Sequence, residues 1–151
     1  QMESVYEQLP AECLSQVLLQ GQWANQEIVR RHKAAIDSGA GSVIFGLASF
    51  AEGMDFPGDY CCHVVIAKIP FSVPDDPVHS TLSEWLEKKG GNAFMELMLP
   101  EASLRLHQAC GRLIRTEKDE GRVTILDRRI VTKRYGKQLL DDLPPFRREF
   151  G

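Results

Sequence analysis

Short apolar runs alternate along the chain with amphipathic stretches. The runs are rich in β-branched residues and predict four strands, at residues 16–20, 42–47, 62–68 and 123–126. The amphipathic stretches predict helices at residues 2–9, 25–37, 80–89, 101–115 and 132–140. Continuously apolar strands separated by helices are typical of a parallel sheet that is covered on both faces. The pattern therefore predicts a three-layer α/β/α fold with a mostly parallel sheet, in one domain spanning residues 1–151.

Composition narrows the class of protein. The chain is 43% hydrophobic and 26% charged, which is ordinary for a globular domain. No apolar run approaches the ~20 residues that cross a bilayer, and the first residues lack the basic and apolar regions of a signal peptide. We therefore expect a cytoplasmic protein with no membrane partner.

The charge is distributed unevenly. Residues 1–100 carry 6 Lys and Arg against 13 Asp and Glu, whereas residues 101–151 carry 12 against 8. A basic C-terminal third on an acidic body favours a site for an anion over a broad DNA-coating surface.

Cysteines and histidines do not form a metal-binding pattern. The four cysteines contain no C-x-x-C pair, and the close group Cys61-Cys62-His63 lies in a predicted strand. Successive strand side chains point to opposite faces, so these three cannot readily converge on one ion. We expect no metal site, and no iron–sulfur cluster held by this chain.

Residues 46–58 directly follow a predicted strand and carry the first candidate chemistry. Ser49 and Glu52 have the spacing of a capping box, and Gly53 helps to limit any helix to about one turn. Asp55 would then lie near the sheet edge, beside free backbone N–H groups of the kind that bind phosphates. The local pattern alone favours the simpler alternative, in which these residues only end a strand and cap a short helix.

The predicted helix at residues 101–115 carries the second candidate. One face is apolar, and a second stripe holds Arg105, Gln108, Arg112 and Arg115 at intervals of three, four and three. Arginines one turn apart suit a phosphoryl group. Gly111, inside this helix, suggests close approach by another backbone or a ligand, since it costs about 1 kcal/mol relative to alanine. An equally weighted alternative is a solvated stripe that pairs with Glu101, Glu117 or Asp119.

The two segments together resemble a known family. Gly46–Gly58 resembles motif V, and Q-A-C-G-R-L-I-R at residues 108–115 resembles motif VI, of superfamily 2 helicases. S-F-A-E-G-M-D at residues 49–55 resembles the form found in the DinG/XPD branch. The likeness continues through K-I-P-F and P-x-x-P at residues 68–77 and through L-D-x-R, Y-G and L-P at residues 126–144. The resemblance covers nearly the whole chain, and it is closer to bacterial DinG-type proteins than to eukaryotic XPD.

This resemblance implies the second RecA-like motor domain of an ATP-dependent 5′–3′ DNA helicase that acts in repair or replication. In such P-loop NTPase-type motors, two RecA-like domains clamp ATP. Arg112 and Arg115 would be the γ-phosphate contact and the arginine finger, with the assignment between them open, and Gln108 would order the triphosphate or the attacking water. The further implied contacts are Gly53, Asp55 and Gly111 with the nucleotide, and Ser49 and Glu52 with single-stranded DNA.

Departures from the family pattern indicate an incomplete site. No G-x-x-x-x-G-K-[ST] or D-E-A-H run occurs, so the chain lacks the lysine-bearing loop that cradles the β- and γ-phosphates and Mg²⁺. We therefore expect an excised fragment, without the strand that carries motif IV, that shares ATP and Mg²⁺ with an absent first RecA-like domain of the same protein. Any iron–sulfur cluster would belong to that absent part.

Two functions from other classes stay open. The same α/β layers could form a nucleotide-independent module that docks a repair or replication protein through the loop at residues 70–77. They could also form a small-molecule enzyme with Asp55 as acid or base, although no second catalytic group is evident.

Overall fold

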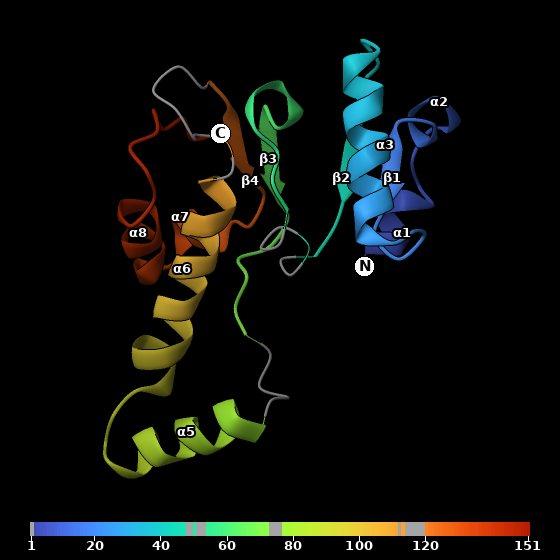
Figure 1. Ribbon diagram of the computed structural model, residues 1–151. Helices are drawn as coiled ribbons and strands as arrows, with labels where there is room; N and C mark the ends of the chain where they lie inside the picture. Colours follow the sequence, from blue (N-terminus) through green and yellow to red (C-terminus); the bar gives the residue numbers. More distant parts are fainter. Residues whose placement is uncertain (1, 48–49, 51–53, 73–76, 112, 114–119) are drawn as a thin grey trace. The chain divides into compact units, whose positions relative to one another are not determined.

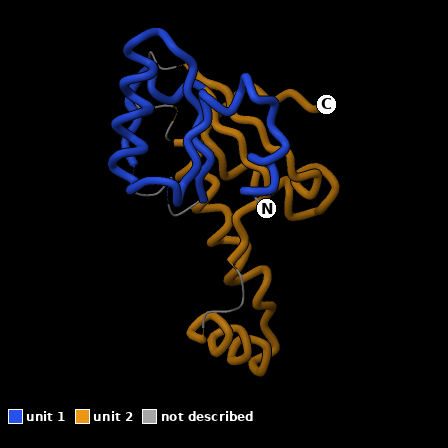
Figure 2. The backbone as a smooth tube through the Cα atoms, turned by 90° about the vertical axis from the view of Figure 1, so that its right-hand side faces the viewer, with its two compact units in different colours: residues 1–62 blue, residues 63–151 orange. Residues whose placement is uncertain are grey.

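A computed structural model describes residues 2–47, 50, 54–72, 77–111, 113 and 120–151. The chain divides into two units, residues 1–62 and residues 63–151 (Figure 2). Each unit contains one pair of parallel strands together with several helices. The structure is therefore α/β with parallel strands, as the alternation of apolar runs and amphipathic stretches predicts.

Unit 1 is a strand–helix–strand element preceded by two short helices, α1 (Met2–Tyr6) and α2 (Ala11–Leu14). Strand β1 (Val17–Leu19) pairs in parallel with β2 (Val43–Phe45), and helix α3 (Asn25–Asp37) connects them (Figure 1). Helix α3 contacts both strands and the 3₁₀ turn η1 (Gly58–Tyr60).

Helix α3 has the bounds that its sequence predicts. Ile28 and His32, one turn apart, are its buried residues, while Glu27 lies in the first turn, where a negative charge is favourable. The helix ends before Gly39, whose φ of 79° is the left-handed conformation that commonly follows a helix.

Unit 2 begins with β3 (His63–Ile66), which pairs in parallel with β4 (Arg122–Ile125). Helix α5 (Pro77–Lys88), the π-helix η2 (Phe94–Met98) and helix α6 (Leu99–Cys110) lie between these strands in the sequence. Helices α7 (Arg129–Thr132) and α8 (Arg134–Asp141) follow β4. Helix α6 packs against α8, and the buried core consists of Ile69, Leu99, Ala102, Leu106, Ile130 and Leu139.

A π-helical turn precedes Pro100, the second residue of α6. Proline has no N–H to donate, and its ring crowds the carbonyl four residues earlier. That carbonyl belongs to Glu96, inside η2. The wider π turn accommodates the proline there, so η2 and α6 run on as one helical segment.

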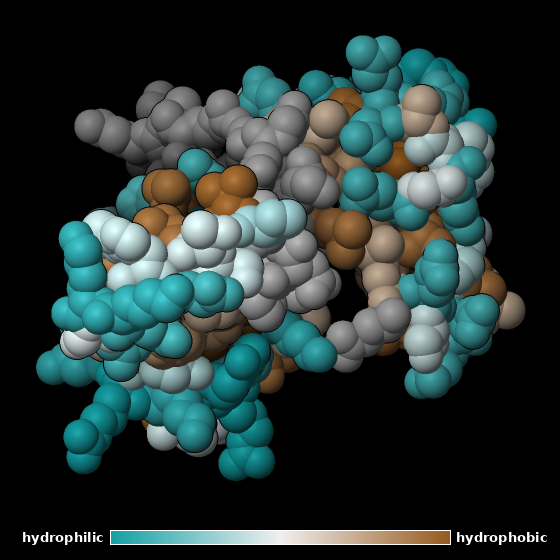
Figure 3. Space-filling view, turned by 90° about the horizontal axis from the view of Figure 1, so that it is seen from below, coloured by the Kyte–Doolittle hydropathy of each residue, from teal (hydrophilic) through white to brown (hydrophobic). Residues whose placement is uncertain are grey.

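Hydrophilic residues cover much of the face shown in Figure 3, and hydrophobic residues appear in small groups between them. Exposed large hydrophobic residues are spread over several elements and include Trp23 of unit 1, Trp85 of α5 and Leu104 of α6. In the described part of the chain, none of the helices combines the length and the apolar character that crossing a bilayer requires.

The predicted helix at residues 132–140 is divided in the structure. Lys133 has extended backbone angles (φ −106°, ψ 146°) and separates α7 from α8. A Cβ on Gly136 would lie 2.9 Å from the carbonyl oxygen of Arg129 and well inside contact distance of the carbonyl of Ile130. The glycine thus allows α8 to approach the backbone of α7 closely, which periodicity in one segment does not reveal.

We predict that Gly136→Ala destabilises the fold by about 3 kcal/mol, the upper end of typical overpacking costs. In an uncrowded helix the same change would stabilise by roughly 1 kcal/mol. Gly111→Ala is the matched control, because Gly111 has a right-handed helical backbone and a Cβ there would come no closer than 3.2 Å to a carbonyl of its own preceding turn. Urea unfolding of both variants checks this, and a stabilised Gly136→Ala variant would contradict the close approach.

Candidate functional site

The segment that resembles motif V is held at its start by the exit of the first strand pair. The Gln20 N–H donates to the Phe45 carbonyl at 2.9 Å, and the Leu47 N–H donates to the Gln20 side-chain oxygen at 2.8 Å. Phe50 is 4% exposed and its N–H donates to the Leu47 carbonyl at 3.0 Å. Gln20 therefore continues the pairing of β1 with β2 beyond the last strand residue.

The same segment is held at its other end by His32, a buried residue of α3. Its Nε2 lies 2.8 Å from the Tyr60 carbonyl oxygen, and its Nδ1 lies 2.8 Å from the Ser42 hydroxyl. A carbonyl only accepts, so Nε2 carries the hydrogen and, in the neutral ring, Nδ1 accepts from Ser42. Phe56 meets the His32 ring edge to face, with ring centroids 5.3 Å apart. Sequence reasoning missed this role of His32, and also that of Gln20.

Of the predicted residues in this segment, the structure describes only Asp55, which is exposed and immediately precedes Phe56. Ser49, Glu52 and Gly53 lie outside the described residues. The capping box and the phosphate-binding geometry therefore stay predictions, within a segment whose two ends are anchored by Gln20 and His32.

Helix α6 carries the start of the segment that resembles motif VI. Leu106 and Cys110 are fully buried on its core face, and Gln108 is exposed. Burial raises the pKa of the Cys110 thiol to about 11, so this thiol stays protonated at neutral pH. Arg112 and Arg115 lie outside the described residues, while Leu113 between them is 3% exposed. The structure thus shows a core-anchored helix with Gln108 on an exposed face.

Two expectations about this helix need correction. Gly111 caps the end of α6 and does not lie inside it, and among the described atoms a Cβ there would contact only carbonyls of its own preceding turn. Arg105 does not extend a free basic stripe. Its guanidinium lies 2.6 Å from a Glu101 carboxylate oxygen and 3.5 Å from the Pro70 carbonyl, so the alternative of pairing with Glu101 is confirmed for this arginine.

Asp127, in the segment L-D-x-R, organises the exit of the second strand pair. One carboxylate oxygen accepts from the Ile69 N–H at 3.0 Å, the other from the Arg129 N–H at 3.0 Å, and the Arg129 guanidinium approaches to 2.6 Å. These hydrogen bonds from Arg129 hold the pKa of the Asp127 carboxyl well below its ordinary value. The Arg129 guanidinium also lies over the Phe71 ring, 5.4 Å from its centroid.

The group Cys61-Cys62-His63 does not lie wholly in a strand as expected, because β3 begins at His63. Cys13 and Cys62 are exposed, Cys110 is buried, and His63 bonds to the Thr124 hydroxyl at 2.9 Å. Within the described ranges, no three His, Cys, Asp or Glu side chains are grouped so that they could hold one metal ion.

Comparison with known proteins identifies related chains. A family model described as Helicase C-terminal domain matches residues 1–146. The chain is similar to the ATP-dependent DNA helicase DinG of Photobacterium profundum, with 50% identity over 133 residues that cover 88% of this chain and 19% of the relative. It is 45% identical to the Escherichia coli protein of the same name over 130 residues, 86% of this chain and 18% of the relative. The chain thus spans about a fifth of the length of these relatives.

We predict that Asp127→Asn lowers the stability of this chain at pH 7 by roughly 1.5–3 kcal/mol, because hydrogen bonds to a charged carboxylate are lost. The folded-state pKa of Asp127 is depressed, so its contribution is present above the unfolded-state pKa of about 3.9 and is lost as the pH falls through the folded-state value. The difference in the free energy of unfolding between wild type and Asp127→Asn should therefore become smaller below about pH 4.

Urea unfolding of both proteins between neutral and acidic pH measures this difference. Glu27→Gln is the control. Arg30 and Arg31 also lower the pKa of Glu27, to about 2, but these ion pairs lie at the surface of α3, where solvent weakens them, so the substitution should change stability little. A difference that stays constant with pH would show that the Asp127 charge does not stabilise the fold.

Proposed function

The chain belongs to the Helicase C-terminal domain family, and on this premise we propose that it is the second, RecA-like motor domain of an ATP-dependent DNA helicase of the DinG type. The observation that carries the proposal is the family match over residues 1–146 together with the intact Q-A-C-G-R-L-I-R segment at residues 108–115. We propose one three-layer domain over residues 1–151.

The anchoring of α6 supports a catalytic role for the segment that follows it. A helix whose core face is buried holds the backbone at its end in a defined position. Such positioning of side chains is a large part of catalysis in phosphoryl transfer. We assign Arg112 and Arg115 to the γ-phosphate contact and the arginine finger. Their planar guanidinium groups can donate to several phosphate oxygens as negative charge develops. Gln108 would order the triphosphate or the attacking water, with Gly111 beside the nucleotide.

The segment that resembles motif V supplies the second set of contacts in the proposal. Gln20 at its start and His32 at its end support a loop that is held at both ends of its path. Within it we assign Gly53 and Asp55 to the nucleotide, and Ser49 and Glu52 to single-stranded DNA. These contacts would connect DNA binding to hydrolysis.

The donor set of the chain fits half of an ATP site. It provides arginines, a glutamine and backbone N–H groups, and it contains no lysine-bearing phosphate loop. A first RecA-like domain of the same protein would provide that loop and most of the Mg²⁺ coordination, together with any iron–sulfur cluster. We further propose 5′–3′ movement and a role in DNA repair or replication, in the cytoplasm.

We predict that this 151-residue chain alone hydrolyses no ATP above background and binds the nucleotide weakly, because it contains no lysine-bearing phosphate loop. Steady-state phosphate release and calorimetric titration with ATP and Mg²⁺ measure both properties. Turnover that co-purifies with the chain and disappears in Arg112→Ala would show that the site is complete.

In the full-length protein, Arg112→Ala and Arg115→Ala should each abolish DNA-stimulated ATP hydrolysis, while the Kd for ATP changes little. An arginine finger acts on the transition state and contributes on the order of 10³–10⁵ in kcat in related phosphoryl transfers. Lysine at either position should rescue poorly, because a compact ammonium does not reproduce the guanidinium fork.

Arg147→Ala is the control for these variants. Its side chain is 89% exposed, it pairs with Glu149 at 2.8 Å, and it lies outside the matched residues 1–146. Arg105 is unsuitable, since its removal would leave Glu101 without that partner and so affect stability. Normal hydrolysis by both alanine variants would refute the motor assignment.

A further inference from the structure

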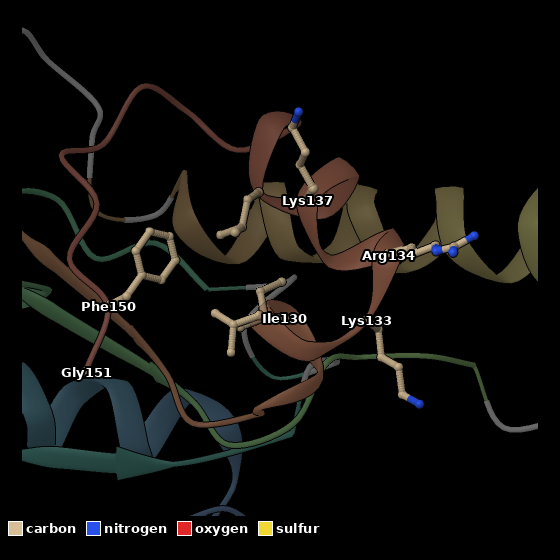
Figure 4. Close-up of a pocket in the computed structure, with 8 residues that line it drawn as sticks. Ile130, Lys133, Arg134, Lys137, Phe150 and Gly151 are labelled. Carbon is tan, nitrogen blue, oxygen red and sulfur yellow. The ribbon is translucent and has the colours of Figure 1, made fainter.

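Helices α7 and α8 and the last residues of the chain line a pocket of about 580 Å³ (Figure 4). Its apolar lining residues are Ile130, Val131, Leu140 and Phe150. The Phe150 ring lies across from Ile130 (Figure 4). Phe150 is 66% exposed and Val131 is 56% exposed, so apolar surface in this pocket faces solvent. The volume is in the range of sites for small organic groups.

Lys133, Arg134, Lys137 and Gly151 complete the lining, and none of the eight lining residues has an acidic side chain. The nearby carboxylates of Asp141 and Glu149 pair with Arg148 at 3.1 Å and with Arg147 at 2.8 Å. In the described part of the chain, no ion pair engages the three cations of the pocket. The pocket therefore combines an apolar and aromatic lining with three cations that form no ion pair with another described residue.

We propose that this pocket binds a segment of single-stranded nucleic acid, with a base against Phe150 and the apolar lining and with phosphates on Lys133, Arg134 and Lys137. Cations interleaved with an aromatic side chain are the usual composition of such sites. The Lys133 side chain leaves the residue between α7 and α8, and Arg134 and Lys137 leave α8, each in a different direction (Figure 4). They therefore cannot all contact one phosphate, whereas the successive phosphates of a strand can reach each of them.

This contact is additional to motifs V and VI and rests on the proposed function. Phe150 and Gly151 lie beyond residues 1–146, which the family model matches. A contact near the C-terminal end would add affinity for a strand that the motor domains already hold.

Fluorescence anisotropy with a labelled oligodeoxythymidylate, without nucleotide and over a series of salt concentrations, tests the proposal on this chain. Each phosphate contact on a single strand contributes roughly 0.7 to the slope of log affinity against log salt. In Lys133→Ala/Arg134→Ala/Lys137→Ala, which loses three such contacts, the magnitude of this slope should therefore decrease by about 2. Phe150→Ala should weaken binding about fivefold or more and leave the slope unchanged. Thermal unfolding confirms that the variants fold.

The matched control removes three cations elsewhere, in Arg30→Ala/Lys88→Ala/Lys89→Ala, and should bind like the wild type. Wild-type affinity in both pocket variants would overturn the proposal. Displacement of the oligonucleotide by a millimolar excess of thymidine monophosphate would assign the pocket to a free nucleotide. Equal displacement by polyglutamate of the same length would show an attraction to polyanions alone, and either result would also overturn the proposal.

The same pocket variants, made in the full-length protein, separate this inference from the proposed function. We expect them to require a higher DNA concentration for half-maximal stimulation of ATP hydrolysis. Absence of stimulated hydrolysis in the wild type would refute the motor assignment alone. Stimulated hydrolysis with the same DNA dependence in wild type and pocket variants would refute the pocket assignment alone.

Discussion

A pair of parallel strands leaves backbone donors without a strand partner where the strands end, and in each unit a side-chain oxygen accepts from one of them. In unit 1 the Gln20 amide oxygen accepts from the Leu47 N–H. In unit 2 the Asp127 carboxylate accepts from the Ile69 N–H. Ile69 is 4% exposed, and a buried donor left unpaired there would cost roughly 1–3 kcal/mol, whereas Leu47 is 60% exposed and water could replace Gln20. These two acceptors therefore fix the paths of the segments that leave the strand pairs, including the one to which we assign nucleotide and DNA contacts.

Helix α6 separates buried from exposed positions within one turn. Cys110 is in the core, and Gln108, two positions earlier, is exposed. Arg105 has the same charge as the motif arginines, but Glu101 and Pro70 engage it inside unit 2. A charged stripe on a helix is thus not one functional unit.

The positive charge of the C-terminal third is divided in the same way. Arg129, Arg147 and Arg148 pair with the carboxylates of neighbouring residues. The described ion pairs do not include the lysines of the pocket beside α8, which leaves their charge available to an external anion. The number of cationic residues in a segment therefore overstates the positive charge that is available to a ligand, because internal ion pairs neutralise part of that charge.

The sequence by itself determined the four strands, the bounds of α3 and the buried face of α6, because each follows from apolar periodicity within one segment. The family also followed from the sequence, through segments with a distinctive order of residues. Only the tertiary structure decided the partners of Gln20, His32 and Asp127, which lie 27, 28 and 58 positions away in the sequence. It also decided the break between α7 and α8, where Gly136 meets the backbone of another helix. Periodicity describes which side of an element is apolar, whereas a hydrogen bond or a close backbone contact depends on which distant atoms the fold brings within reach.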